Sequence, residues 1–201
     1  MCIIKYRGTQ LGGYHMNIKS NFLAFLIIPI FAISCTSVPP LDFIVQDVGV
    51  IDNRKDASLL SITAGYAPQS KQKKMECNNY DVPRIFKEGL QDAINRSLAF
   101  KDDADQKVNL SVRIVTCDMP AFGASMTTKF GAIYEIIDRE NGDLLFSETV
   151  MSEGVVPMDY AFVGLVRAQE SVNRSARNNI ADFINLLNDA DISNPIFRGN
   201  D

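Results

Sequence analysis

The sequence has no tryptophan, a single histidine at position 15 and only four cysteines among its 201 residues. It also has no excess of positive charge: 20 basic residues stand against 24 acidic ones, which gives a net charge of −4. This balance argues against bulk nucleic-acid binding, because such binding depends on clustered basic residues. The overall composition, with 46% hydrophobic and 22% charged residues, is that of an ordinary globular protein.

An apolar run over residues 22–33 is the longest hydrophobic feature of the chain. Its length of about twelve residues suits the core of a signal peptide and falls short of the roughly 20 residues that span a bilayer. Lys19 supplies the positive charge expected in front of such a core. We expect translation to start at Met16, because a compact charged segment begins there, and we expect residues 1–34 to be removed.

The end of this run, Ser34-Cys35, resembles the lipobox of bacterial lipoproteins, although Ala32 stands where leucine is more usual. The resemblance implies that Cys35 is acylated, becomes the mature N-terminus and anchors the protein to a lipid bilayer, which several acyl chains do stably. In the sorting rule of Gram-negative lipoproteins, Thr36 in place of aspartate implies the periplasmic face of the outer membrane. The alternative is an ordinary cleaved signal with a coincidental cysteine.

Removal of residues 1–34 changes what chemistry the chain can perform. The mature protein would have 167 residues, and the loss of three basic and no acidic residues would take the net charge from −4 to −7. It would also have no histidine, which excludes Ser-His-Asp and Cys-His catalysis and imidazole-based metal sites. We therefore expect no enzymatic activity, cofactor or metal. An enzyme would have to use carboxylates, among which Glu135, Asp138 and Glu148 are candidates.

Two cysteines, Cys77 and Cys117, remain after maturation. In an oxidising periplasm such a pair can form a disulfide. Cys77 falls in a polar loop and Cys117 at the end of a predicted strand, so their meeting is compatible with the pattern. The alternative is a buried Cys117 with an exposed Cys77.

Local patterns place the secondary structure of the mature chain. Residues 108–115 alternate apolar and polar side chains, which predicts a strand with one buried face. Pro83 opens an amphipathic pattern typical of a helix, and Asn141-Gly142 predicts a hairpin turn. The expected elements are strands over 43–50 and 58–64, a helix over 83–100, strands over 108–115, 127–137 and 144–151, and a helix over 160–188.

This order predicts an α+β fold. We expect a single domain over residues 42–188, in which an antiparallel sheet containing a three-strand meander is packed by two helices, in the order ββ-α-βββ-α. A lipidated tether over 35–41 would precede the domain. A polar tail over 189–201 would follow it, with Ile196 and Phe197 as residues able to hold the tail to the domain.

Three arginines form the most distinctive surface pattern. At about 100° per residue, Arg167, Arg174 and Arg177 fall on one side of the last predicted helix, opposite its apolar face. Such a stripe is a candidate site for an acidic partner. The alternative is a solvated face paired locally with Glu170 and Asp182.

The order of elements resembles that of small Gram-negative envelope lipoproteins, such as YajG-type lipoproteins and the auxiliary lipoproteins of ABC-type transporters. The resemblance covers residues 83–188 and is carried by the following residues: Pro120-Ala121-Phe122-Gly123, Met126-Thr127, Asn141-Gly142, residues 159–164, Asn173, Ala176, Arg177, Asn179 and Ile180. These motifs are structural, so the resemblance is informative for the fold and says little about an activity.

Two functions are compatible with these features. The first is a non-enzymatic module that binds a protein partner, as yet unidentified, in envelope assembly or maintenance. The second is a lipid- or glycan-binding accessory component of a transport system. In the second case the ligand would lie in a crevice between the long helix and the sheet, with Phe122, Met126 and Phe162 as wall residues, although the same residues also suit simple core packing.

Overall fold

The computed structural model describes residues 38–77 and 81–199, in a chain that divides into the units Met1–Cys35 and Thr36–Asp201. The expected translation start, the signal segment and the lipidation site Cys35 lie outside the described residues. In chain order, the elements of the second unit are β1 (Ser58–Tyr66), η1 (Gln69–Lys71), α1 (Val82–Ser97), β2 (Lys107–Asp118), β3 (Met126–Asp138), β4 (Leu144–Val156), η2 (Met158–Tyr160) and α2 (Gly164–Asp189). Among the described residues, no helix is long and apolar enough to cross a membrane.

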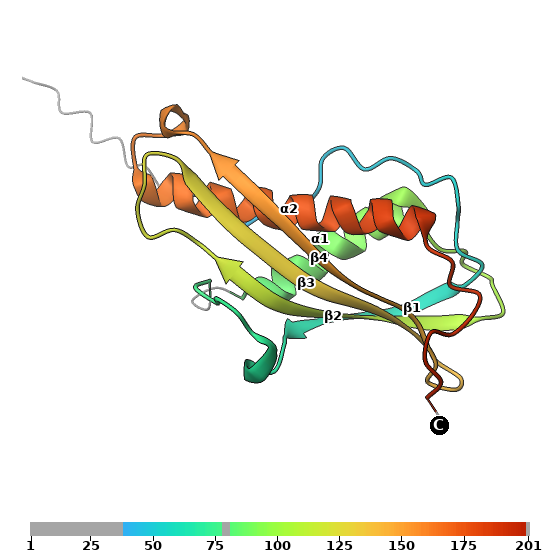
Figure 1. The fold of residues 1–201 in the computed structure, drawn as a ribbon. Coiled ribbons are helices and arrows are strands. Elements are labelled where there is room, and N and C mark those ends of the chain that lie inside the picture. Colours follow the sequence, from blue (N-terminus) through green and yellow to red (C-terminus); the bar gives the residue numbers. More distant parts are fainter. Residues whose placement is uncertain (1–37, 78–80, 200–201) are drawn as a thin grey trace, which may run out of the picture. The chain divides into compact units, whose positions relative to one another are not determined.

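The four strands form one sheet in the order β1-β2-β3-β4 (Figure 1). Strands β2, β3 and β4 pair antiparallel, which confirms the predicted meander and the α+β class. Strand β1 instead pairs parallel with β2, so the sheet is mixed. Parallel neighbours need a crossover connection, and α1 supplies it between β1 and β2.

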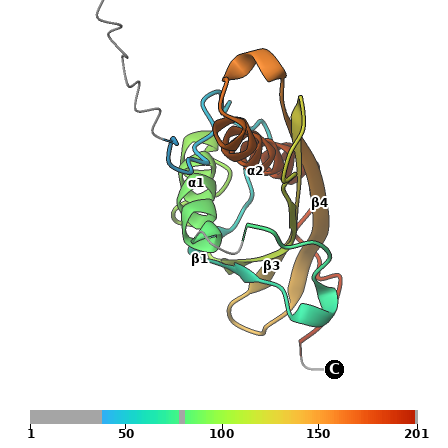
Figure 2. The ribbon, with the colours of Figure 1, turned by 90° about the vertical axis from the view of Figure 1, so that its left-hand side faces the viewer.

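Both helices pack on the same face of the sheet (Figure 2). The alternation predicted for β2 is confirmed, because Val108, Leu110, Val112 and Ile114 are all buried beneath the helices. Aromatic rings fill the centre of this core. The Phe86 and Phe130 rings stack at 5.1 Å between centroids, and the Tyr134 and Phe183 rings stack at 4.0 Å.

The strand predicted over residues 43–50 is wrong. These residues belong to an extended segment, 41–53, which we call the strap and which runs along both helices without joining the sheet. Its backbone is bound by helix side chains: Arg96 donates to the carbonyl of Val45 at 2.6 Å, and Asn188 Oδ1 accepts from the amide of Asp52 at 3.0 Å. The apolar pattern did report burial, since Phe43 is buried, but its ring lies against Phe86 of α1 and Phe130 of β3 and the segment pairs with no strand.

The C-terminal tail is held to the domain by the pair that the sequence suggested. Leu144 and Phe197 form an isolated antiparallel bridge beside the β3–β4 hairpin. The Leu144 amide donates to the Phe197 carbonyl at 2.8 Å, and the Ile196 amide donates to the Leu144 carbonyl at 2.8 Å. In the hairpin itself, only Gly142 adopts a positive φ, of 80°. The tail therefore extends the sheet at its hairpin end.

A disulfide joins Cys77 to Cys117, and both residues are fully buried. The segment before Cys77 returns along the end of β2, where Lys74 accepts from the amide of Cys117 at 2.8 Å and Glu76 donates to the carbonyl of Cys117 at 2.9 Å. The bond spans 40 residues of sequence and encloses the α1 crossover. In the chain-entropy description, a loop of this size contributes about 4 kcal/mol to stability.

Helix α2 lies unusually close to β4. A Cβ atom on Gly154 would lie 2.3 Å from both the Ser171 carbonyl oxygen and the Ser175 amide nitrogen. Both atoms belong to backbone, so no side-chain rotation can make room. The absence of a side chain at Gly154 is therefore what allows α2 and β4 to pack backbone to backbone.

Replacing Gly154 with alanine tests this packing. We expect Gly154→Ala to lower the free energy of unfolding by about 2–4 kcal/mol, since the helix must shift away from the strand. Gly65→Ala in β1 is the matched control, because nothing lies within 4 Å of its added Cβ. Urea denaturation of the two variants measures the difference. Equal stabilities would show that α2 is not fixed by this contact.

Candidate functional site

Two connections lie side by side at the end of the sheet where α2 begins (Figure 1). One joins β2 to β3 and the other joins β4 to α2 through η2. We call residues 119–126 and 157–165 the tip. Asp159 is the single charged residue in these two segments, in a chain that is 22% charged. The tip is therefore almost uncharged.

Arg167 holds the two halves of the tip together. Its side chain is buried, and its Nη1 donates to the carbonyls of Ala161 at 2.6 Å and Phe162 at 3.1 Å. Its Nη2 donates to the carbonyl of Gly123 at 3.2 Å. One planar guanidinium thus binds backbone from both connections, as its several fixed donors allow.

A small open hollow of about 300 Å³ lies between the two connections. Its lining is mostly apolar and includes Phe122, Met126 and Leu165. The structure thus brings together two of the three predicted wall residues, in different environments: Met126 is buried, whereas Phe122 is 88% exposed. Phe162 is fully exposed, at 102%, and does not line the hollow. The prediction that Phe162 lines a crevice between α2 and the sheet is therefore wrong.

The first described residues of the chain are bound to α2 close to the tip. The Pro39 carbonyl accepts from Gln169 Nε2, and Gln169 lies in the second turn of α2. The Asp42 amide donates to Asn173 Oδ1 at 3.0 Å, and the Asp42 carbonyl accepts from Arg177 Nε at 2.9 Å. Residues 39–42, which the sequence suggested as the end of a tether and the start of the domain, are thus fixed to α2.

The predicted arginine stripe does not form a common solvent-facing surface. Arg167 is buried in the tip, so the prediction is wrong for this residue. Arg174 pairs with Glu170 at 3.0 Å and lies 5.1 Å from the centre of the Tyr160 ring. Arg177 binds the backbone of the strap. The three guanidiniums organise the N-terminal half of α2 and the segments around it.

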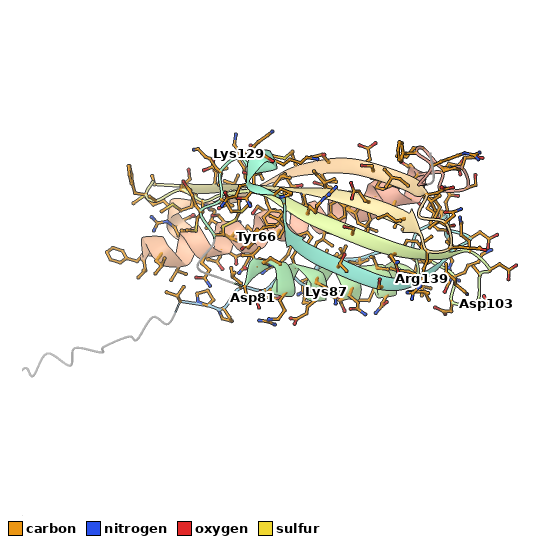
Figure 3. The ribbon with its side chains drawn as sticks, turned by 90° about the horizontal axis from the view of Figure 1, so that it is seen from below. Tyr66, Asp81, Lys87, Asp103, Lys129 and Arg139 are labelled. Atoms are coloured by element: carbon orange, nitrogen blue, oxygen red, sulfur yellow. A yellow bond between two sulfur atoms is a disulfide. The ribbon has the colours of Figure 1, made fainter. Side chains whose placement is uncertain are left out.

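The candidate carboxylates are dispersed. Glu135 pairs with Arg113 on the face of the sheet that the helices leave uncovered, the side seen in Figure 3. Asp138 accepts from Gln106 Nε2 at 2.9 Å beside the β3–β4 hairpin, whereas Glu148 is exposed on β4. Within residues 38–77 and 81–199, no group of three His, Cys, Asp or Glu side chains is placed to hold a metal ion.

Buried polar groups of α2 are a feature that the apolar pattern did not reveal. Tyr134 donates from its hydroxyl to Asn179 Oδ1 at 2.8 Å, and Asn179 Nδ2 donates to the Val150 carbonyl at 2.9 Å. Burial, with a smaller contribution from the Asp182 charge, raises the pKa of Tyr134 well above its ordinary value. The phenol therefore stays neutral and serves as a hydrogen-bond donor that positions α2.

Removing the Arg167 guanidinium tests its role in the tip. In Arg167→Ala three carbonyls lose a charged donor, so we expect faster hydrogen exchange confined to residues 119–126 and 157–165, with a stability loss of about 2–3 kcal/mol. Arg84→Ala, which removes an exposed arginine that pairs within and beside α1, is the control and should leave exchange in the tip unchanged. Unchanged exchange in Arg167→Ala would contradict the role.

Comparison with known proteins gives similarity of fold alone. No protein-family model and no curated protein matches the sequence. Similar solved structures include a candidate lipoprotein from Caulobacter crescentus, with 14% identity over 67% of this chain and 88% of that one, at a TM-score of 0.39. A DUF330 protein from Xanthomonas campestris has 10% identity over 70% and 91% of the two chains, at a TM-score of 0.45.

A homologue of a neuraminyllactose-binding hemagglutinin from Helicobacter pylori is also similar, with 10% identity over 72% of this chain and 90% of that one, at a TM-score of 0.40. At identities and TM-scores this low, the similarities assign neither a family nor an activity to the chain.

Proposed function

We propose that this chain is a lipid-anchored protein of the bacterial cell envelope. Acylated Cys35 would hold it at the periplasmic face of the outer membrane, and the domain would act as a non-enzymatic binding or accessory module. The observation that carries the proposal is the lipobox-like Ser34-Cys35, followed after only a few residues by a segment bound to α2.

The short stretch of chain between Cys35 and Pro39 limits how far the domain can lie from the lipid surface. Cys35 lies four positions before Pro39, and an extended chain covers at most about 3.6 Å per residue. The Pro39 carbonyl is bound by Gln169. An acyl chain on Cys35 would therefore hold the domain within about 14 Å of the lipid surface. A protein placed in this way acts at the membrane surface and does not reach across the periplasm.

Several features support a binding role over catalysis. The mature chain would have no histidine. The carboxylates of Glu135 and Asp138 are engaged in contacts within the fold. The Cys77–Cys117 disulfide is buried, which suits an oxidising compartment and leaves these thiols in a structural role. Together with the resemblance of the sequence to small envelope lipoproteins, these contacts favour an accessory module.

A lipid- or glycan-binding accessory of a transport system is the second candidate. The hollow at the tip favours it, because its lining is mostly apolar and includes Phe122 and Met126. The hollow is open and its volume of about 300 Å³ is at the small end of ligand pockets. A short apolar group would fit there, whereas a whole lipid would not be enclosed.

Substitution of Cys35 tests the anchor. In cells, Cys35→Ala should incorporate no labelled palmitate and should be absent from the outer-membrane fraction, because the acylated atom is missing. Cys2→Ala makes the same change upstream of the expected translation start and should have no effect on either measurement. Recovery of Cys35→Ala with the outer membrane, as for the unaltered protein, would contradict the proposal.

The binding role has its own test. Crosslinking in intact cells, followed by purification of the full-length protein, should recover one defined envelope partner, and recovery should fall for Cys35→Ala because the variant is no longer held at the membrane. The proposal fails if no partner is recovered and deletion of the protein also leaves envelope integrity unchanged.

A further inference from the structure

We infer that the tip is a membrane-docking surface, which inserts Phe122 and Phe162 into the headgroup region of the bilayer that holds Cys35. The inference rests on the proposed lipid anchor and extends it: the acyl chains would fix the protein to the membrane, and the tip would fix its orientation there. Four features support it: the exposed side chains, the low charge of the tip, its rigidity and the position of the N-terminal chain.

The three most exposed large apolar side chains of the described residues all lie in the tip. Phe162 and Phe122 are almost completely open to solvent, Met158 is 67% exposed and Leu165 is 52% exposed. Isolated exposed residues of this kind are normal on a protein surface, but a contiguous group marks a site of interaction. Aromatic residues exposed beside a lipid surface favour the interface between headgroups and acyl chains.

The surroundings of these side chains suit a lipid surface. Asp159 is the single charged residue of the tip, so insertion would desolvate few charges. Tyr160 is half-exposed, and the centre of its ring lies 5.1 Å from the guanidinium carbon of Arg174. A ring with a polar hydroxyl next to a cation is suited to the level of the phosphate groups. The apolar end is thus bordered by the amphipathic Tyr160 ring and by Arg174, which pairs with Glu170.

The tip is also preorganised. Arg167 binds the Phe162 carbonyl and the Gly123 carbonyl next to Phe122, so one buried guanidinium fixes the backbone beside both exposed phenylalanines. The buried side chain of Met126 packs beneath the same hollow. Because the loops are held by these contacts, the aromatic rings stay exposed and do not fold back into the core. Binding would then cost little ordering of the backbone.

The position of the N-terminal chain selects a bilayer as the occupant. Pro39 is bound to Gln169, one helical turn from Leu165, which is a distance of about 6 Å along α2. Four residues further back, Cys35 is within about 14 Å of Pro39. An acyl chain on Cys35 therefore brings lipid to this end of the domain. The Phe197 side chain, 61% exposed, lies at the hairpin end, roughly 40 Å away along β3.

The absence of tryptophan from the chain allows a direct test. Phe122→Trp and Phe162→Trp each place a single reporter in the tip, and Phe197→Trp makes the same change on an exposed ring at the other end of the sheet. The full acylated protein is reconstituted into vesicles of phosphatidylethanolamine and phosphatidylglycerol, with and without brominated acyl chains. Equal melting temperatures of the three variants establish equal folding.

We expect the emission of both tip reporters to shift to shorter wavelength in vesicles and to be quenched by the brominated lipid, with no change for Phe197→Trp. Unquenched tip reporters in protein whose acylation is verified by mass would overturn the docking and leave the anchor intact. Absence of acylation by mass would instead overturn the anchor. A shift that depends on protein concentration without lipid would overturn the inference in favour of contact between copies.

Discussion

The close approach of α2 to β4 is the constraint on which the rest of the domain depends. Gly154 lets the backbone at Ser171 and Ser175 reach β4. The buried hydrogen bond from Tyr134 to Asn179 fixes the same helix to the neighbouring strand, β3. A helix held at this distance has a defined rotation about its own axis. That rotation decides which of its polar side chains meet the strap, which meet the tip and which meet solvent.

Helix α2 consequently holds both the tip and the first described residues of the chain. Its N-terminal half uses Arg167 to join the two connections of the tip, and uses Gln169 and Asn173 to bind the first described residues of the chain. The segment next to the proposed anchor and the exposed phenylalanines are therefore parts of one rigid arrangement. A change at Gly154 would disturb both, because it would move the part of the helix that holds them.

The sequence predicted the fold class and the meander well, because alternation along β2 and the turn at Gly142 are local signals of burial and chain reversal. It failed for residues 43–50, where an apolar stretch reports burial but cannot show whether the chain pairs with a strand. It failed for Arg167 for a related reason. A helical projection separates apolar from charged faces, but it cannot show that two loops cover the charged face and accept its hydrogen bonds.

The proposed anchor changes what the tip would have to contribute. Acyl chains on Cys35 would already hold the protein at the membrane, so docking of the tip would be intramolecular and would proceed at high effective concentration. Even weak insertion of two aromatic rings would then suffice to choose one orientation. In that orientation the strands of the sheet would lead away from the lipid. The hairpin end with Phe197 lies roughly 40 Å from the tip, so an envelope partner would be free to approach it there.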